Sequence, residues 1–238
     1  MKILYLNCAT RLSSKKGDTP QRVWLKDFVC DNDIDIVCLA ESSNYNFNES
    51  LPDIFKNENC WFPTDTYLAK RGYKLNICSR HEVVYKPLNY GISHNLIDGD
   101  YEKVLYDYGY GTLITMRFDK VEVVAVHIQY PQHKYPSPYN LYYELGLRTL
   151  YNYMKQKKPL AVFGDFNNYP GDVSFEKLKT IYRNANNDTD AFSYINESSG
   201  TKFLIDHTFT VSDTLIMEYI DTLSHGFDHK GMLITIEQ

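Results

Sequence analysis

Residues 160–168 read Leu-Ala-Val-Phe-Gly-Asp-Phe-Asn-Asn, and this stretch decides how the rest of the chain is interpreted. Four apolar residues that follow Pro159 are too few for a helix and predict a strand buried on both faces. Because residues two apart in a strand face the same side, we expect Asp165 and Asn167 to project together and Phe166 to enter the core. A carboxylate beside an amide is suited to holding a water molecule or a metal ion near a phosphate. In isolation the same residues are typical of an ordinary turn.

The bulk composition is that of an ordinary globular protein. The chain has 238 residues, of which 43% are hydrophobic and 23% charged, and no repeat or linker divides it, so we expect a single domain over residues 1–238. No apolar run has membrane-spanning length and the start is strand-like, which predicts an intracellular protein with no membrane contact. The five cysteines have no metal-ligand spacing and are interpreted as reduced, buried thiols.

The charge pattern gives no general attraction to nucleic acid. The formal net charge is −5, although bound divalent cations could supply positive charge where a nuclease meets its substrate. A basic cluster at residues 70–74 is interpreted as a solvated edge or a phosphate contact. The 21 tyrosines, several of them in a loop at residues 130–139, could stack on bases or sugars, or could simply belong to the core and its rim.

Helical spacing of apolar residues occurs in three places. Residues 21–30 form one expected helix, and Tyr143, Leu147, Leu150 and Met154 repeat at the spacing of a second. A third is expected after Asp172, which is a residue type that commonly caps helices.

Polar side chains lie at or near the ends of the remaining predicted strands. We expect strands at residues 2–6, 34–40, 75–80, 83–85, 112–118, 121–128, 202–205, 216–220 and 232–236, and extended chain at residues 208–211. Strand ends are where layered α/β folds build their sites. The polar residues at these positions are Asn7, Glu41, His127, Asp165, Asn167, Asp206, Asp228 and His229.

Two of these carboxylates are candidate metal ligands. Mg²⁺ takes oxygen ligands, usually one or two carboxylates with water and substrate phosphate, and Glu41 and Asp228 could provide them, with Mn²⁺ as a substitute ion. A histidine paired with a carboxylate can polarise a phosphoryl oxygen or exchange protons, which suits His229 oriented by Asp206.

The other polar residues have roles in the same chemistry. Asp165 could activate or position an attacking water molecule. Asn167 and Asn7 could donate hydrogen bonds to the phosphate or to a carboxylate, and His127 could act on the leaving group or bind a phosphate oxygen.

Six segments in this order resemble the endonuclease/exonuclease/phosphatase superfamily of Mg²⁺-dependent phosphoesterases. They run from residue 7 to residue 229 and so cover nearly the whole chain. The segments are Leu6-Asn7, Ala40-Glu41, Val126-His127-Ile128, Gly164-Asp165-Phe166-Asn167, Ile205-Asp206-His207 and Asp228-His229. The resemblance implies an α+β fold, a four-layer α/β sandwich in which two mostly antiparallel sheets pack face to face and helices cover the outside.

The resemblance also implies roles for individual residues. Glu41 is similar to the main metal ligand of the family, with Asp228 assisting it, and His127 matches the histidine of the deoxyribonuclease-like branch. The pair His229 and Asp206 is similar to the family's phosphate-contacting pair, and Asp165 with Asn167 to the residues that handle the nucleophilic water. The chain departs from the family pattern at three flanking positions, where it has Leu6, Ala40 and Phe227.

Three functions are compatible with these residues. The first is a metal-dependent nuclease that hydrolyses phosphodiesters in DNA or RNA, the commonest activity of the branch that contains His127. The second is a phosphodiesterase or phosphatase for a small molecule, such as a nucleotide second messenger or an inositol phosphate, which the acidic balance favours. The third is a binding module that keeps the fold without catalysis, which the presence of every required residue type disfavours.

Overall fold

The computed structural model describes residues 1–9, 12, 19–42, 75–80, 84–87, 112–118, 120–131, 138–168, 171–186 and 192–237. Expectations for the basic cluster at 70–74 and for most of the tyrosine-rich loop at 130–139 lie outside these ranges. The strands are β1 (Lys2–Asn7), β2 (Ile36–Ala40), β3 (Leu75–Ser79), β4 (Val84–Pro87), β5 (Thr112–Phe118), β6 (Val121–His127), β7 (Ala161–Asp165), β8 (Arg183–Asn184), β9 (Tyr194–Ile195), β10 (Lys202–Phe203), β11 (Asp206–Thr210), β12 (Leu215–Ile220) and β13 (Gly231–Ile236). The helices are α1 (Pro20–Asp31), α4 (Pro138–Lys157), α5 (Val173–Glu176) and the 3₁₀ turns η2 (Lys177–Thr180) and η3 (Leu223–His225).

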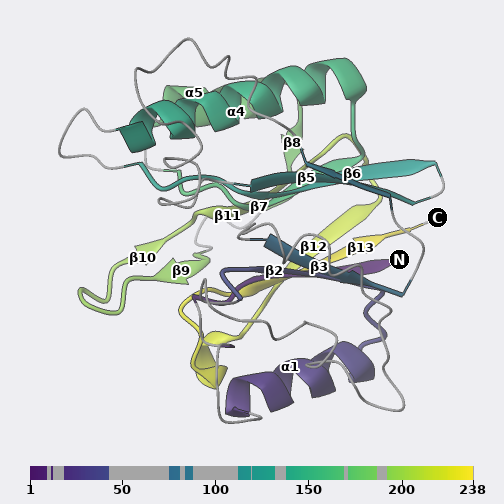
Figure 1. The fold of residues 1–238 in the computed structure, drawn as a ribbon, viewed down its shortest axis with the longest axis vertical. Coiled ribbons are helices and arrows are strands. Elements are labelled where there is room, and N and C mark those ends of the chain that lie inside the picture. Colours follow the sequence, from purple (N-terminus) through teal and green to yellow (C-terminus); the bar gives the residue numbers. More distant parts are fainter. Residues whose placement is uncertain are drawn as a thin grey trace, which may run out of the picture.

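Two sheets lie face to face in the middle of the molecule (Figure 1). One has the strand order β12-β13-β1-β2-β3, and the other has the order β4-β5-β6-β7-β11-β8. Each contains one parallel pair, β1 with β2 and β6 with β7, among antiparallel neighbours. The short β9–β10 hairpin projects from the side of the sandwich.

The alternation of side chains along β1 explains how the sheets acquire two buried faces. Ile3 and Tyr5 point into the core between the sheets, whereas Leu4 and Leu6 point to the opposite side, where they pack beneath α1. The second sheet is also buried on both faces, because Val124, Val126 and Val162 pack against α4 and α5. Fully apolar strands of this kind are expected when helices cover a sheet.

The layers therefore run α1, first sheet, second sheet, and α4 with α5, as Figure 1 shows. The four-layer α/β sandwich expected from the sequence is confirmed.

Helix α1 begins at the N-cap Thr19, whose hydroxyl accepts a hydrogen bond from the Arg22 N–H, and Pro20 occupies its first turn. Among the described residues, no helix is both long and apolar enough to cross a membrane.

Most predicted elements are found within a few residues of their expected positions, and two of them differ in detail. The sequence predicts a strand over 202–205 that ends at Asp206-His207, with extended chain over 208–211. The structure has β10 ending already at Phe203, and the extended chain begins at Asp206 as β11. The helix expected after Asp172 is one short α-helical turn, α5, continued by the 3₁₀ turn η2. Asp172 does cap it, accepting hydrogen bonds from the N–H groups of Ser174 and Phe175.

Gly164 is required by the close approach of two strands and of the facing sheet. It lies opposite Val126 in the parallel β6–β7 pair and has φ 139°. A Cβ atom here would lie 2.0 Å from the Val126 carbonyl oxygen and 3.0 Å from the Tyr5 ring. Both contacts are to well-packed atoms, so a side chain has no room.

We predict that Gly164→Ala destabilises the protein by more than about 4 kcal/mol, because the methyl group collides with backbone and the backbone dihedral is strained. Gly171→Ala is the matched control, since Gly171 has φ 81° but no atom lies within 4 Å of the place that its Cβ would take; it should cost only about 1–2 kcal/mol. Urea unfolding followed by circular dichroism measures both. Equal losses for the two variants would contradict the steric argument.

Candidate active site

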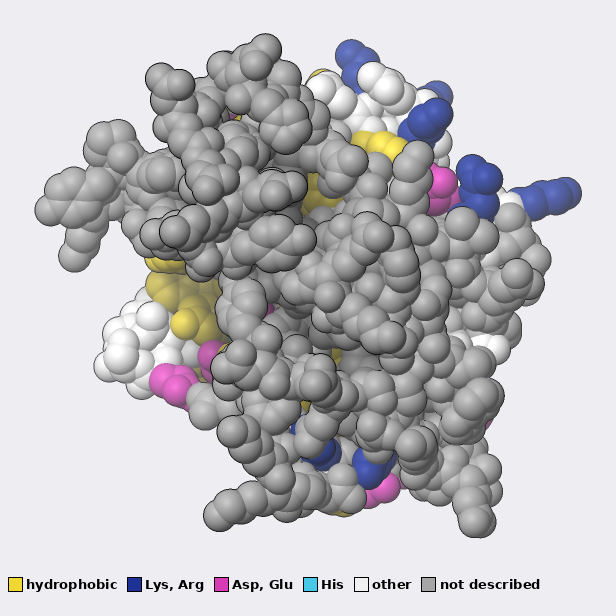
Figure 2. Space-filling model, viewed as in Figure 1, with side chains coloured by type: hydrophobic (Ala, Val, Ile, Leu, Met, Phe, Trp, Pro, Cys, Tyr) yellow, Lys and Arg dark blue, Asp and Glu magenta, His cyan; other side chains and the backbone are white. Residues whose placement is uncertain are grey.

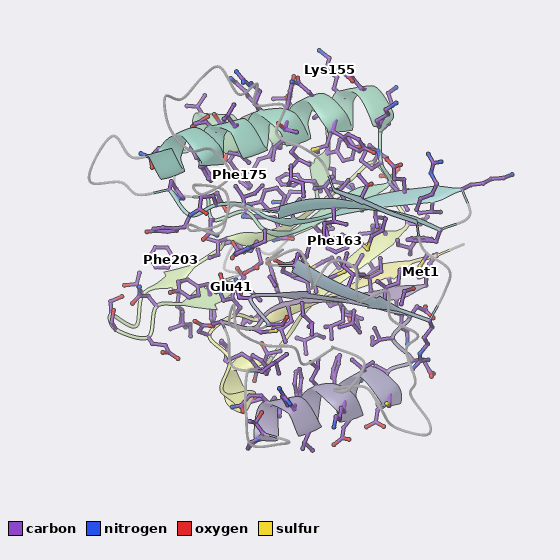
Figure 3. All side chains as sticks on the ribbon, viewed as in Figure 1. Met1, Glu41, Lys155, Phe163, Phe175 and Phe203 are labelled. Carbon is purple, nitrogen blue, oxygen red and sulfur yellow. The ribbon has the colours of Figure 1, made fainter. Side chains whose placement is uncertain are left out.

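The strand register brings three of the expected site residues together in one sheet. In the order β6-β7-β11, His127 pairs with Asp165, and Asp165 pairs with Asp206 on its other side. Asp165 therefore lies between a histidine and a second carboxylate. In the facing sheet, Asn7 and Ala40 are partners in the parallel β1–β2 pair, which places Glu41 directly beyond the end of β2. Figure 3 shows Glu41 at the edge where both sheets meet the β9–β10 hairpin.

Asp165 is buried, and hydrogen bonds hold both of its carboxylate oxygens. Asn7 Nδ2 donates to Oδ2 across the space between the sheets at 2.9 Å, and the Asn167 N–H donates to Oδ1 at 2.8 Å. Burial and the neighbouring Asp206 raise the pKa of Asp165 to about 6, although His229, His127 and the Asn167 N–H oppose the rise. The carboxylate is therefore a base whose protonation changes close to neutral pH.

Asp206 and His229 form a buried pair. His229 Nδ1 lies 2.9 Å from Asp206 Oδ2, and atoms of Asp165, Asp206 and His229 that could act as ligands lie within 4.8 Å of one another. Burial lowers the pKa of His229, but the interactions with Asp206 and with the other nearby carboxylates outweigh it and raise the pKa to about 9. His229 is therefore an imidazolium at neutral pH, with Nδ1 directed at Asp206.

His127 lies between two carboxylates. Its Nε2 is 3.0 Å from Glu41 Oε1 and 3.9 Å from Asp165 Oδ2, and neither contact has the alignment of a hydrogen bond. His127 is buried, whereas the Glu41 side chain is 34% exposed. The structure thus brings Glu41 from one sheet to the histidine of the other, with its carboxylate open to solvent.

The backbone at two site residues adopts the left-handed conformation. Glu41 has φ 49° and Asn167 has φ 48°. An asparagine tolerates this region, but for a glutamate it costs about 1–3 kcal/mol, and such strain is concentrated at functional sites. Asp165 and Asn167 are expected to project together from the end of their strand; β7 ends at Asp165, so Asn167 lies in the turn beyond it. The Asn167 side chain instead donates to the Ile128 carbonyl at 2.8 Å.

A segment of the first sheet presents Asp228 and His229. Thr222 is fully buried, its hydroxyl donates to the His229 carbonyl, and the Gly231 N–H donates back to that hydroxyl at 3.1 Å. Phe227, one of the residues that depart from the family pattern, is buried and packs against Trp24 of α1, with 5.7 Å between ring centroids. Phe227 therefore anchors the segment that carries Asp228 and His229 to α1.

Tyr5 is a component of the site that the sequence analysis did not single out. Its hydroxyl donates to the Val126 carbonyl at 3.0 Å and accepts the Asp165 N–H at 2.9 Å, so it ties the first sheet to the strands that carry His127 and Asp165. Burial and the nearby carboxylates, above all Asp165, raise its pKa well above the usual value, which keeps the hydroxyl neutral. The only sequence feature that could have indicated this role is that Tyr5 carries a hydroxyl group in an otherwise apolar strand.

His207, which follows Asp206 in one of the six segments, lies in the core. It packs among Phe166, Phe175 and Phe209. Burial lowers its pKa to about 4, so the ring is neutral. Asn184 Nδ2 lies 3.2 Å from its Nδ1, and its Nε2 lies 3.0 Å from Asn168 Oδ1, which fixes the turn that follows Asp165 and Asn167.

The donor atoms at this edge fit a hard divalent cation. Four carboxylates gather here, two of them fully buried, and the buried Asp206 Oδ1 has no hydrogen-bond partner among the described residues. Glu41 and Asp228 lie near the same buried thiol, because after burial they are the groups that raise the pKa of Cys8. Oxygen-rich sets of this kind suit Mg²⁺ or Mn²⁺ better than softer ions.

We predict that in the metal-free protein His229 titrates near pH 9 and that Asp206→Asn lowers this pKa by at least about one unit. Because the pKa is raised on folding, the stabilisation is complete below about pH 6.5 and is lost as the pH rises through about 9. Nuclear magnetic resonance of the imidazole protons measures the pKa. Asp213→Asn, which changes a fully exposed carboxylate, is the control and should leave the titration of His229 unchanged; an equal shift in both variants would refute the pairing.

Comparisons with known proteins agree with this geometry at the level of the fold. The sequence matches no protein-family model and no curated protein. Among solved structures, the chain is similar to an endonuclease/exonuclease/phosphatase family protein from Leptotrichia buccalis, with 14% identity over 100% of both chains and a TM-score of 0.61.

Two further solved structures have the same similarity. The 3'-5' exonuclease NExo from Neisseria meningitidis has 16% identity over 100% of both chains and a TM-score of 0.62. An AP endonuclease from Archaeoglobus fulgidus has 14% identity over 100% of both chains and a TM-score of 0.61. The resemblance inferred from the six segments is confirmed for the architecture: this chain has the fold of the endonuclease/exonuclease/phosphatase proteins.

Proposed function

We propose that this protein is a divalent-metal-dependent phosphodiesterase of the nuclease type, acting on DNA or RNA. The observation that carries the proposal is the buried Asp165 carboxylate, held on both oxygens and placed within a few ångströms of the Asp206–His229 pair. A base, a cationic hydrogen-bond donor and oxygen ligands for a cation thus converge at one edge of the sandwich, which is the set of groups that phosphodiester hydrolysis requires.

Asp165 is suited to receive the proton of the attacking water. Its raised pKa of about 6 leaves it ionised at pH 7 and above but still basic enough to accept a proton. Asn7 and the Asn167 N–H fix the carboxylate, so that one orientation is maintained. The water oxygen forms a new bond to phosphorus while the bond to the leaving oxygen breaks, and the leaving oxygen gains a proton from His127 or from solvent.

His229 is suited to bind a phosphoryl oxygen. Its Nδ1 faces Asp206, which leaves Nε2–H as a charged donor toward the substrate. Bound at Glu41 with the help of Asp228, Mg²⁺ or Mn²⁺ would neutralise the charge that develops on the phosphoryl oxygens. The protein's own residues provide the orientation and the proton transfer.

Similarity to nucleases favours polynucleotides over small phosphate esters. The neighbours include an exonuclease and an AP endonuclease, which match this chain over its full length. A comparison of bis(p-nitrophenyl) phosphate, p-nitrophenyl phosphate and plasmid DNA, each with Mg²⁺, Mn²⁺ or EDTA, tests the proposal. Nicking of plasmid that EDTA abolishes would support it, and turnover of the small esters alone would replace it with a small-molecule phosphoesterase.

We predict that Glu41→Ala abolishes Mg²⁺-dependent hydrolysis while leaving the fold intact, because it removes the main carboxylate of the proposed metal site, whose side chain is 34% exposed. Calorimetric titration with Mg²⁺ and a rate assay measure the two effects. Glu218→Ala, on the exposed face of β12, is the matched control and should bind metal and turn over like the wild type. Unchanged activity in Glu41→Ala would remove Glu41 from the metal site.

We predict that His229→Ala lowers the rate constant by about 10²–10⁴-fold, because a charged donor to the phosphate is lost. Single-turnover hydrolysis measures the effect. His225→Ala removes a histidine four residues away that stacks on Trp24, at 4.7 Å between ring centroids, and it should retain the rate of the wild type. A loss of less than tenfold in His229→Ala would show that another group contacts the phosphate.

A further inference from the structure

Two lysines beside the proposed site converge on one aromatic ring. Lys202 Nζ lies 4.3 Å from the centroid of Phe192, and Lys230 Nζ lies 3.8 Å from the same centroid. Lys230 also lies 6.0 Å from the ring of Tyr219. Two ammonium groups thus contact one half-buried ring.

The two lysines have no counter-charge within the described part of the chain. No described carboxylate forms an ion pair with either ammonium group, whereas described cations elsewhere do form such pairs, as Lys179 does with Glu176. Lysines often cover apolar rings with their methylene stems and leave the charge in water. Here, however, both charges contact the same ring, in a chain whose net charge is −5.

Backbone contacts connect this lysine pair rigidly to His229 and Asp206. Lys230 directly follows His229, and its N–H donates to the Ser193 carbonyl at 2.7 Å. The Ser193 hydroxyl in turn accepts the Asp206 N–H at 2.9 Å. On the same hairpin, Tyr194 contacts the His229 ring, with 4.7 Å between centroids. Lys202 lies in β10 of this hairpin, paired with Ile195, so the backbone positions of both lysines are fixed relative to the proposed phosphate-binding histidine.

We propose that Lys202 and Lys230 bind a backbone phosphate that flanks the scissile phosphodiester, so that the substrate is a polynucleotide strand rather than an ester with a single phosphate. This inference rests on the proposed function. The Phe192 ring holds both ammonium groups through cation–π contacts and reduces the cost of ordering them. A substrate without a second phosphate would gain nothing from this pair, whereas each phosphate of a strand neutralised by a lysine releases a bound counterion.

The first test measures binding without hydrolysis. Anisotropy of a fluorescein-labelled single-stranded oligodeoxynucleotide, in EDTA and over a range of salt concentrations, reports the dissociation constant. The double variant Lys202→Gln/Lys230→Gln should bind about tenfold more weakly, and the slope of log K against log salt should become shallower by about 0.7, since one neutralised phosphate on a single strand is lost. Lys202→Arg/Lys230→Arg keeps both charges and should bind like the wild type.

The matched control removes two lysines from the far end of the molecule. Lys155 and Lys157 lie in the last turn of α4, where Lys and Arg side chains gather in Figure 2, on the opposite side of the view from the β9–β10 hairpin. Lys155→Gln/Lys157→Gln changes the net charge by the same amount and should leave the binding and the salt slope unchanged. An equal loss in both double variants, or no loss in Lys202→Gln/Lys230→Gln, would overturn the proposal.

A second test separates this inference from the proposed function. Lys202→Gln/Lys230→Gln should raise KM for an oligodeoxynucleotide but leave hydrolysis of thymidylyl-thymidine and bis(p-nitrophenyl) phosphate unchanged, because these esters have one phosphate. An equal loss on all substrates would mean that the lysines act on His229 and would refute a flanking contact. If the wild type hydrolyses nothing with Mg²⁺ while the binding difference persists, the proposed function fails and the lysine site stands.

Discussion

The arrangement of the two sheets depends on satisfying one buried carboxylate. Asp165 lies in the middle of the second sheet, where an ionised group without hydrogen bonds would be very unfavourable. Asn7 supplies a hydrogen bond from the facing sheet, and Tyr5, two residues earlier on the same strand, binds the backbone N–H of the same residue. The packing distance of the sheets at this edge is therefore fixed by polar contacts, and Gly164 is the residue that makes the close approach sterically feasible.

This arrangement explains why the pKa of Asp165 is raised, which disfavours its charge, while the raised pKa of His229 favours its charge. Asp165 and Asp206 are cross-strand partners, and burial together with the charge of Asp206 disfavours the ionised form of Asp165. His229 compensates by remaining protonated beside Asp206. A base and a cationic donor therefore arise from the same three residues, and the residual negative charge of the cluster provides the attraction for a divalent cation.

The sequence was sufficient to predict most element boundaries, because its apolar residues follow clear helix and strand periodicities. The layers and the site residues could be predicted because six segments resemble those of a known family and occur in the same order. It could not predict contacts that depend on register between distant strands. The hydrogen bond of Asn7 to Asp165 joins residues far apart in the chain, and the role of Tyr5 follows from the sheet-to-sheet distance alone. The left-handed backbone of Glu41 and Asn167 was also invisible, since neither position carries the glycine that usually marks it.

The placement of charge shows how an acidic protein could act on a polyanion. A net charge of −5 gives no long-range attraction, and the carboxylates of the site would repel a phosphodiester in the absence of metal. Positive charge must then be supplied locally, at the two points where a nucleic-acid strand would lie closest to the protein. One is the proposed cation beside Glu41, and the other is the lysine pair over Phe192. The β9–β10 hairpin connects that pair to His229. A single polynucleotide could therefore contact the lysine pair and the proposed phosphate-binding histidine at the same time.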